Sequence, residues 1–138
     1  ILNESAAARS QLNPAVDNVS RCRNLPQAIR TIDSVTQNRY DLLIALDSTP
    51  VDQIDGGFEL ISLLQESLET SYDADLAWLT WAESERDNGC AYGSKSPLYK
   101  NAQSVNKRVD RPKTSFVNMW NSQIAPKYHV RKFTRSEI

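Results

Sequence analysis

Two cysteines and a single histidine are the side chains of this 138-residue chain best suited to chemistry. His129 lies in a basic tail beside Tyr128 and Arg131, with no nucleophile next to it in the sequence, so a nucleophilic arrangement would have to be built around it by the fold. Zinc sites need clustered Cys and His ligands at short spacings, and the chain has no such cluster. Glycine-rich loops of the kind that hold phosphates are also absent. We therefore expect no catalytic residue, no metal site and no cofactor.

The cysteines are better placed for a disulfide. Cys22 is expected to close one helix and Cys90 to follow another. In an up-down-up-down bundle the ends of the first and third helices lie at the same pole, so the topology permits a bridge. Such bonds persist in oxidising compartments, which favours an extracytoplasmic, secreted or cell-surface location. The alternative is two unrelated thiols, with Cys22 a small hydrophobe on the apolar stripe of its helix.

Arg39 and Asp75 each replace an apolar residue on a helical stripe. Their helices are expected to run antiparallel, so the two side chains can meet inside the bundle. A buried pair of this kind either fixes packing and register or recognises a ligand, and the first role is the commoner one.

Four further residues are candidates for binding. Trp81 stands off the apolar stripe beside acidic residues, and Tyr92 lies in a loop, so both are expected to be exposed anchors for a partner; edge packing is the alternative for Trp81. Arg131 and Lys132 belong to the basic group near the C-terminal end.

Charge is distributed unevenly along the chain. Residues 1–94 carry 6 Lys and Arg against 15 Asp and Glu, whereas residues 95–138 carry 10 against 2. Either the basic part docks on the acidic helices, or it forms a patch for an anionic partner. Because the basic residues lack interleaved exposed aromatics, we do not expect nucleic acid as a partner.

The elements that must position these residues are helices. Apolar residues recur at spacings of three and four, which is typical of amphipathic helices, and no strand pattern is evident. Pro14 either kinks the first helix or restarts it with Asn13 as N-cap, and Pro112 predicts a kink in the last. The predicted fold is all-α, a single domain over 1–138 forming an up-down-up-down four-helix bundle with one disulfide, with helices at about 4–22, 25–47, 57–86 and 101–124 and a basic tail at 126–138.

Composition agrees with one ordinary globular domain, since 40% of residues are hydrophobic and 24% charged. No apolar run approaches the roughly 18 residues of a membrane span. The chain begins without Met, so we expect any signal peptide or membrane anchor to be missing from it, and contact with a membrane only through such an anchor.

Scattered positions along nearly the whole chain match one pattern, namely Ala8-Arg9, Leu12, Cys22-Arg23-Asn24-Leu25, Arg39, Leu42-Leu43, Gly56-Gly57, Ser71, Ala74-Asp75, Trp81-Ala82, Gly89-Cys90, Lys113, Trp120-Asn121 and Ala125. The sequence resembles a family of extracytoplasmic helical domains from secreted or membrane-anchored actinobacterial proteins of unassigned function. Pro112, where such helices are alanine-rich, and Ser122-Gln123, which lengthen the segment after Trp120-Asn121, depart from the pattern. The resemblance implies an extracytoplasmic location and a disulfide, and it brings no catalytic residues.

These observations together predict a non-catalytic sensor or interaction domain rather than an enzyme. Its partner would be a protein, a cell-envelope component such as the wall, or a small ligand. A structural spacer that holds a neighbouring module at a set distance is the alternative, and a small helical enzyme is the least favoured reading.

Overall fold

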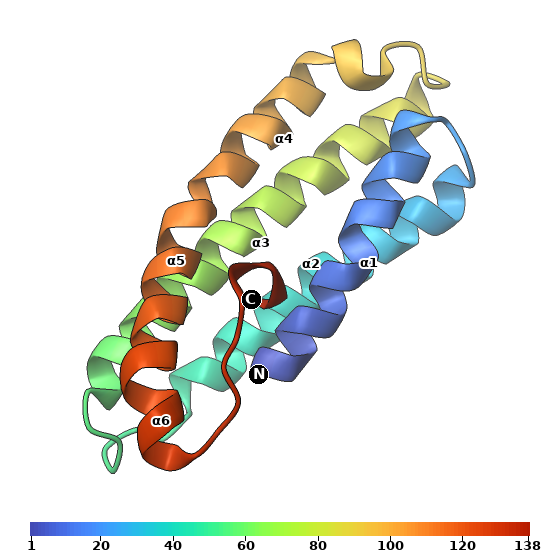
Figure 1. The fold of residues 1–138 in the computed structure, drawn as a ribbon. Helices are drawn as coiled ribbons and strands as arrows, with labels where there is room; N and C mark the ends of the chain where they lie inside the picture. The colour runs from blue at the N-terminus through green and yellow to red at the C-terminus, as the bar shows by residue number, and fades with distance from the viewer.

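The computed structural model describes all 138 residues and is built of helices and their connections (Figure 1). It is an up-down-up-down four-helix bundle, so the predicted fold class is confirmed. The first three helices are α1 (Leu2–Ser20), α2 (Leu25–Asp47) and α3 (Gly57–Asp87). The fourth is divided into α4 (Pro97–Arg108), α5 (Asp110–Met119), a π-helical turn (Trp120–Ile124) and α6 (Ala125–Tyr128). Short 3₁₀ turns lie at Gly93–Lys95 and Arg135–Glu137. None of the helices is both long enough and apolar enough to cross a membrane.

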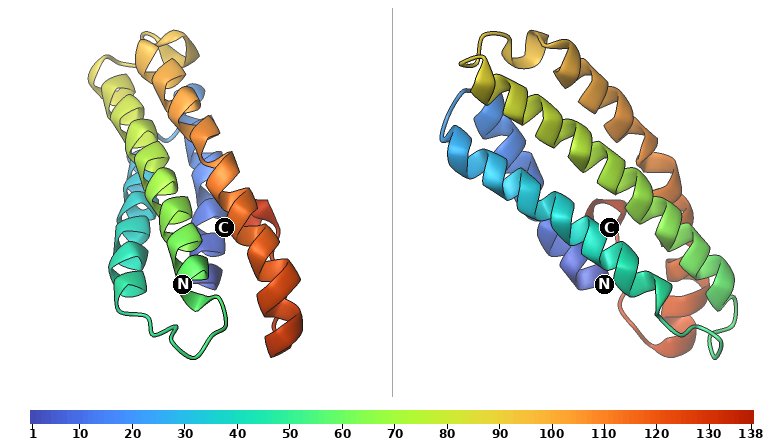
Figure 2. Two further views of the ribbon diagram at one scale, coloured as in Figure 1. Left: turned by 90° about the vertical axis from the view of Figure 1, so that its left-hand side faces the viewer. Right: turned by 180° about the vertical axis from the view of Figure 1, so that it is seen from behind.

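Helix α3 is the central element and runs the length of the molecule in both views of Figure 2. It packs against α2 on one side and against α4 and α5 on the other. Its 31 residues span about 46 Å, whereas the 19 residues of α1 span only about 28 Å. Because α1 is shorter, it leaves part of the bundle uncovered at the pole where α2 ends and α3 begins.

The C-terminal segment covers part of that gap. It turns back from α6, and its 3₁₀ turn lies between α1 and α5 (Figure 1) and packs on both. Phe133 and Ile138 insert into the core, with 6% and 0% of their surface exposed. Asn121 accepts a hydrogen bond from the Phe133 main-chain N–H at 2.9 Å and donates to its carbonyl at 2.7 Å. The indole of Trp120 donates to the carbonyl of Arg131 at 2.9 Å. The basic tail is thus fixed to the bundle by apolar insertion and by its main chain.

The core is divided into two apolar clusters separated by a polar layer. We define the polar layer as Ser5 of α1, Arg39 of α2, Asp75 of α3 and Lys113 of α5, which lie between the two clusters along the bundle. The cluster nearer the disulfide contains Ala8, Leu12, Ala15, Val19, Ala28, Ile29, Ile32, Val35, Trp78, Trp81, Ala82 and Ala102. The other contains Leu42, Leu46, Leu60, Leu64, Leu68, Phe116, Val117, Met119, Ile124, Phe133 and Ile138.

The connection between α2 and α3 is shaped by glycine. Gly56, at the N-cap of α3, has a φ of +73°, a conformation that favours glycine. Gly57 follows in the first turn, where a Cβ would overlap the main-chain oxygen of Val51. The tight return between the two helices therefore requires both residues.

The prolines at positions 14 and 112 affect their helices differently. Helix α1 continues unbroken through Pro14, which is exposed on its surface, so the restart at Asn13 does not occur. The fourth helix is interrupted at Val109, three residues before Pro112, because Pro112 has no N–H to donate to the carbonyl one turn earlier.

The predicted start of the fourth helix at residue 101 is wrong. The helix begins at Pro97, because Ser96 caps it by accepting a hydrogen bond from the Leu98 N–H at 3.2 Å and proline is favoured in the first turn. Helical structure also extends beyond residue 124, through α6.

Candidate functional site

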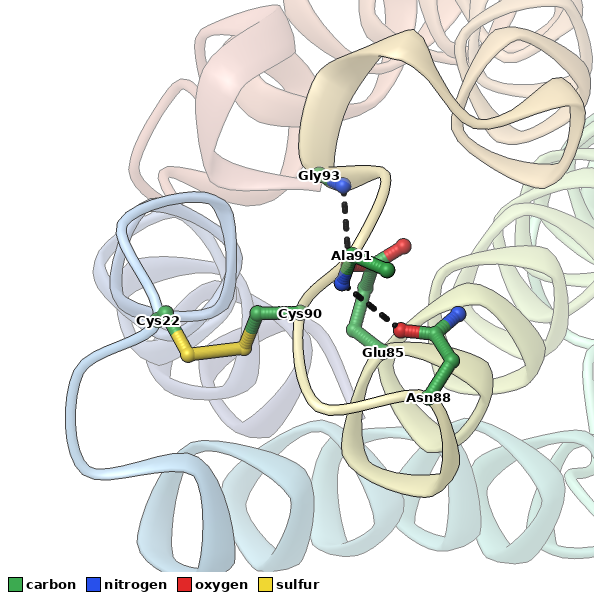
Figure 3. Close-up of a disulfide and its surroundings, with 6 residues drawn as sticks. All are labelled: Cys22, Glu85, Asn88, Cys90, Ala91 and Gly93. Atoms are coloured by element: carbon green, nitrogen blue, oxygen red, sulfur yellow. Dashed lines mark hydrogen bonds between the residues drawn. A yellow bond between two sulfur atoms is a disulfide. The ribbon is translucent and has the colours of Figure 1, made fainter.

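One pole of the bundle is closed by a disulfide between Cys22 and Cys90, with a Cα to Cα distance of 6.0 Å (Figure 3). The bond joins the end of α1 to the loop after α3, so the predicted pairing is confirmed. The loop is held by side chains near the end of α3. Asn88 Oδ1 accepts a hydrogen bond from the Ala91 N–H at 3.0 Å, and Glu85 Oε2 accepts one from the Gly93 N–H at 2.8 Å.

The two aromatic candidates near this pole differ. Tyr92 is 61% exposed beside the disulfide, and its binding role stays a prediction. Trp81 is fully buried, so the expectation of an exposed anchor is wrong. Its indole donates to the carbonyl of Gly93 at 3.2 Å, and its ring packs edge-on against Trp78 and Tyr99. The prediction assumed that α3 buries one apolar stripe only, whereas α3 is buried on two sides, against α2 and against α4.

The Arg39 and Asp75 side chains meet at the centre of the bundle. Arg39 Nε lies 3.4 Å from Asp75 Oδ2, and the residues are 0% and 1% exposed. Arg39 also donates to the hydroxyl of Ser5, while its Nη2 has no partner. Burial raises the pKa of Asp75 despite the opposing charge of Arg39, and burial also lowers the pKa of Arg39.

Lys113 completes this polar layer from α5. It is 3% exposed, and its ammonium donates to the main-chain oxygen of Ile138. Burial lowers its pKa to about 7, and the positive charges of Arg39 and Arg9 add to that effect. The sequence analysis did not single out Lys113 as a buried residue. The signal that identifies it is its position on the stripe of Val109 and Phe116, at spacings of four and three.

Lys113 also lines an open polar cleft of about 380 Å³ between α1, α5 and the C-terminal 3₁₀ turn. Arg9 and Arg135 line the same cleft, so cations from three separate elements face it. Its other lining residues are Ala6, Ser10, Asn13, Asn106, Val109, Asp110, Ser136 and Glu137.

The predicted basic residues of the tail are both exposed. Arg131 pairs with Glu137 at 2.8 Å, donates to Asn3 at 3.1 Å, and stacks on the ring of Phe133 at 3.9 Å from the ring centre. Lys132 makes no hydrogen bond or ion pair. The structure therefore uses Arg131 to fix the tail, and a binding role for either residue stays a prediction.

The acidic and basic parts of the chain are joined by only one ion pair, between Asp55 and Lys127. The other pairs of the basic part, Arg131 with Glu137 and Arg135 with Asp110, form within it. Charge attraction between the two parts is thus a small contribution to the fold, and most of the C-terminal cations remain without an acidic partner.

At the pole opposite the disulfide the surface has hollows that are lined mainly by apolar residues. Two adjoining hollows of about 440 and 460 Å³ share four lining residues, and we call them together the apolar pole. Four large apolar side chains at this end are exposed, namely Ile44, Phe58, Tyr128 and Val130. The shared lining residues are Leu46, Thr49, Val51 and Ile61.

The histidine and the acidic residues form no cluster of the kind that holds a metal ion. His129 is exposed at the end of α6, and no group of three or more His, Cys, Asp or Glu side chains is arranged to hold a metal ion.

Comparison with protein-family models, with characterised proteins and with solved structures finds no significant match.

Proposed function

We propose that this chain is a non-catalytic interaction domain of an oxidising, extracytoplasmic compartment, and that it binds an apolar segment of a partner protein at the apolar pole. The observation that supports this most directly is the concentration of exposed apolar side chains there. Phe58 is 78% and Ile44 56% exposed, and both line a hollow in the surface. Contiguous exposed apolar surface of this kind is typical of interaction sites.

The shape of the apolar pole favours a peptide segment over a compact small molecule. The two hollows lie side by side and share a wall, so an occupant that fills both must be extended. Both are open to solvent, and few charged residues line them: Asp47 borders one and Arg131 the other. The expected occupant is therefore an extended segment with large apolar side chains in its middle.

The compartment is inferred from the disulfide. Disulfides are rare in reducing cytosol and persist in secreted and cell-surface proteins, which is also the location implied by the actinobacterial family resemblance. The bond closes the pole away from the apolar surface, so it stabilises the bundle without occupying the proposed binding face.

Selection from a random peptide library, followed by titration of the selected peptides, tests this function. We expect selected peptides to be rich in apolar residues and to shift the amide signals of residues around Phe58 and Ile61. Phe58→Ser should weaken binding at least about tenfold, as for other central apolar contacts. Leu76→Ser is the matched control, because Leu76 is also partly exposed on α3 but lies about five turns away.

Two results would contradict the proposal. Equal loss of affinity in both variants would show that the peptide binds elsewhere or binds non-specifically. Failure to select any peptide would favour the structural spacer, which needs no binding face and should tolerate Phe58→Ser without consequence.

A further inference from the structure

A seam of aromatic side chains continues the apolar pole along the outside of α2 and α3. These two helices pack side by side, as the right-hand view of Figure 2 shows. One hollow of the apolar pole is lined by Ile44 of α2 and Gln65 of α3. Tyr40 lies one turn before Ile44, and Tyr72 lies two turns after Gln65. The centres of the two tyrosine rings are 6.0 Å apart, so the rings join the helices and extend the hollow away from the pole.

We call these four residues the α2–α3 seam. Tyr40 is 47% exposed and Tyr72 is half-buried, so a bound segment can reach both rings. An exposed aromatic pair beside an apolar hollow offers a contact surface larger than the hollow alone.

The exposed charges nearest to the α2–α3 seam in the sequence are all negative. Residues 40–85 contain 11 Asp and Glu and no Lys or Arg. Asp41 follows Tyr40 directly, and Glu69 and Asp73 lie on either side of Tyr72 in the sequence. All three acids are exposed, and none of them forms an ion pair. The seam is therefore an aromatic surface with carboxylates on both of its helices.

The basic part of the chain does not balance these acids. Its one ion pair with the acidic helices joins Lys127 to Asp55, in the loop before α3 begins. Glu66, Glu69 and Asp73 succeed one another along α3 at spacings of three and four, where like charges repel. A cationic partner placed along the seam relieves this repulsion.

We propose that the α2–α3 seam binds a run of Lys or Arg residues that adjoins the apolar residues of the partner segment. The inference rests on the function proposed for the apolar pole and adds the charge of the partner to it. The aliphatic stems of Lys and Arg pack well on tyrosine rings, and their charged ends are attracted both by the faces of the rings and by the carboxylates beside them.

The length of the seam sets where these cations lie in the partner. Phe58 and Tyr72 are 14 residues apart on α3, which corresponds to about 21 Å along the helix axis. About six residues of an extended chain cover that distance. The cations should therefore begin within about six residues of the apolar side chain that contacts Phe58.

Fluorescence anisotropy of labelled synthetic peptides, titrated with the intact chain, tests the proposal. Three peptides share one apolar run of Leu and Phe and carry three Lys, three Gln or three Glu residues beside it. Each is made with these residues before and after the run, because a segment can lie in either direction. In its better direction the Lys peptide should bind about tenfold more tightly than the Gln peptide, as three exposed ion pairs would give. The Glu peptide should bind more weakly than both, and about 0.5 M NaCl should remove most of these differences.

Two double variants locate the effect. Glu69→Gln with Asp73→Asn should remove most of the advantage of the Lys peptide and leave the affinity for the Gln peptide unchanged. Glu83→Gln with Asp87→Asn is the control, because it removes the same charges from the same helix. Glu83 lies about 15 Å beyond Asp73 along α3, which exceeds the Debye length of about 8 Å at physiological salt, so the control should keep the advantage. All four residues are exposed, so neither change disturbs the core.

The outcomes separate this inference from the function on which it rests. Equal affinity for the Lys and Gln peptides, with both weakened by Phe58→Ser, would overturn the inference alone. Equal loss of the Lys advantage in both double variants would also overturn it, because it would show only general attraction to an acidic protein. Lys-peptide binding that depends on Glu69 and Asp73 but not on Phe58 would support the seam and contradict the function proposed for the pole.

Two further results would reject the partner. Binding of none of the peptides would contradict both the inference and the proposed function. Self-association of the chain at low salt, abolished by Glu69→Gln with Asp73→Asn, would make the basic surface of a second copy the occupant of the seam instead.

Discussion

The lowered pKa of Lys113 makes a quantitative prediction about stability. An unfolded lysine has a pKa of 10.5, whereas burial lowers the pKa of Lys113 in the folded protein to about 7. Between these values the unfolded chain binds a proton that the folded chain does not, so the contribution of Lys113 to the free energy of unfolding rises with pH. The slope is about 1.4 kcal/mol per pH unit. Between about pH 6 and about pH 9 this contribution should therefore increase by about 3 kcal/mol.

Urea unfolding of the wild type and of Lys113→Met across this pH range measures that contribution as a difference, in which the other titrating groups cancel. The curves should diverge, with Lys113→Met relatively more stable at pH 6, where the wild type must bury an ammonium group. Lys107→Met, at an exposed lysine of α4, serves as the control and should follow the wild type in parallel. Parallel curves for wild type and Lys113→Met would refute the reasoning, because they would show that Lys113 titrates alike in the folded and unfolded chains.

Three further changes should affect stability. Reduction of the disulfide between Cys22 and Cys90, separated by 68 residues, should lower the free energy of unfolding by about 4 kcal/mol, as measured by urea unfolding with and without reductant. Arg39→Met alone should lower the free energy of unfolding by about 3–5 kcal/mol, because it leaves the buried carboxylate of Asp75 without a partner. The double variant Arg39→Met with Asp75→Leu should recover most of that loss, and a double variant as unstable as the single one would contradict the expectation. Gly57→Ala should lower the thermal midpoint, because the added Cβ would overlap the main chain of the preceding loop. The expected loss in the free energy of unfolding is about 1–3 kcal/mol, and an unchanged midpoint would show that the loop can move aside.

Much of the fold could be predicted from local patterns. The predicted bounds of the second helix agree with α2, and those of the third helix differ from α3 by one residue. These bounds were predictable because the apolar stripes are clear and are bounded by helix-breaking residues such as Pro50 and Gly56-Gly57. The topology permitted the disulfide, since consecutive antiparallel helices bring the ends of the first and third helices together, and the structure contains it.

The errors arose where more than one neighbour determines burial. Trp81 lies off the main apolar stripe of α3, so it would be exposed if α3 buried that stripe alone. In the structure α4 covers a second face of α3, and Trp81 lies on it. The burial of Lys113 was not predicted, because a charged side chain is normally assigned to the surface even when its position lies on an apolar stripe. The course of the tail was not predictable from periodicity, because Asn121 recognises main-chain atoms of residue 133 and no side-chain pattern records such a contact.

The way the tail is attached has a consequence for how its sequence can vary. Asn121 and Trp120 bond to the backbone of the tail, so they recognise its course rather than the identity of its side chains. Only Phe133 and Ile138 must fill space in the core, and the residues between them are mostly exposed. The tail can therefore accept substitutions at its outward positions while the bundle remains closed, and its charge and surface chemistry are free to diverge independently of the fold.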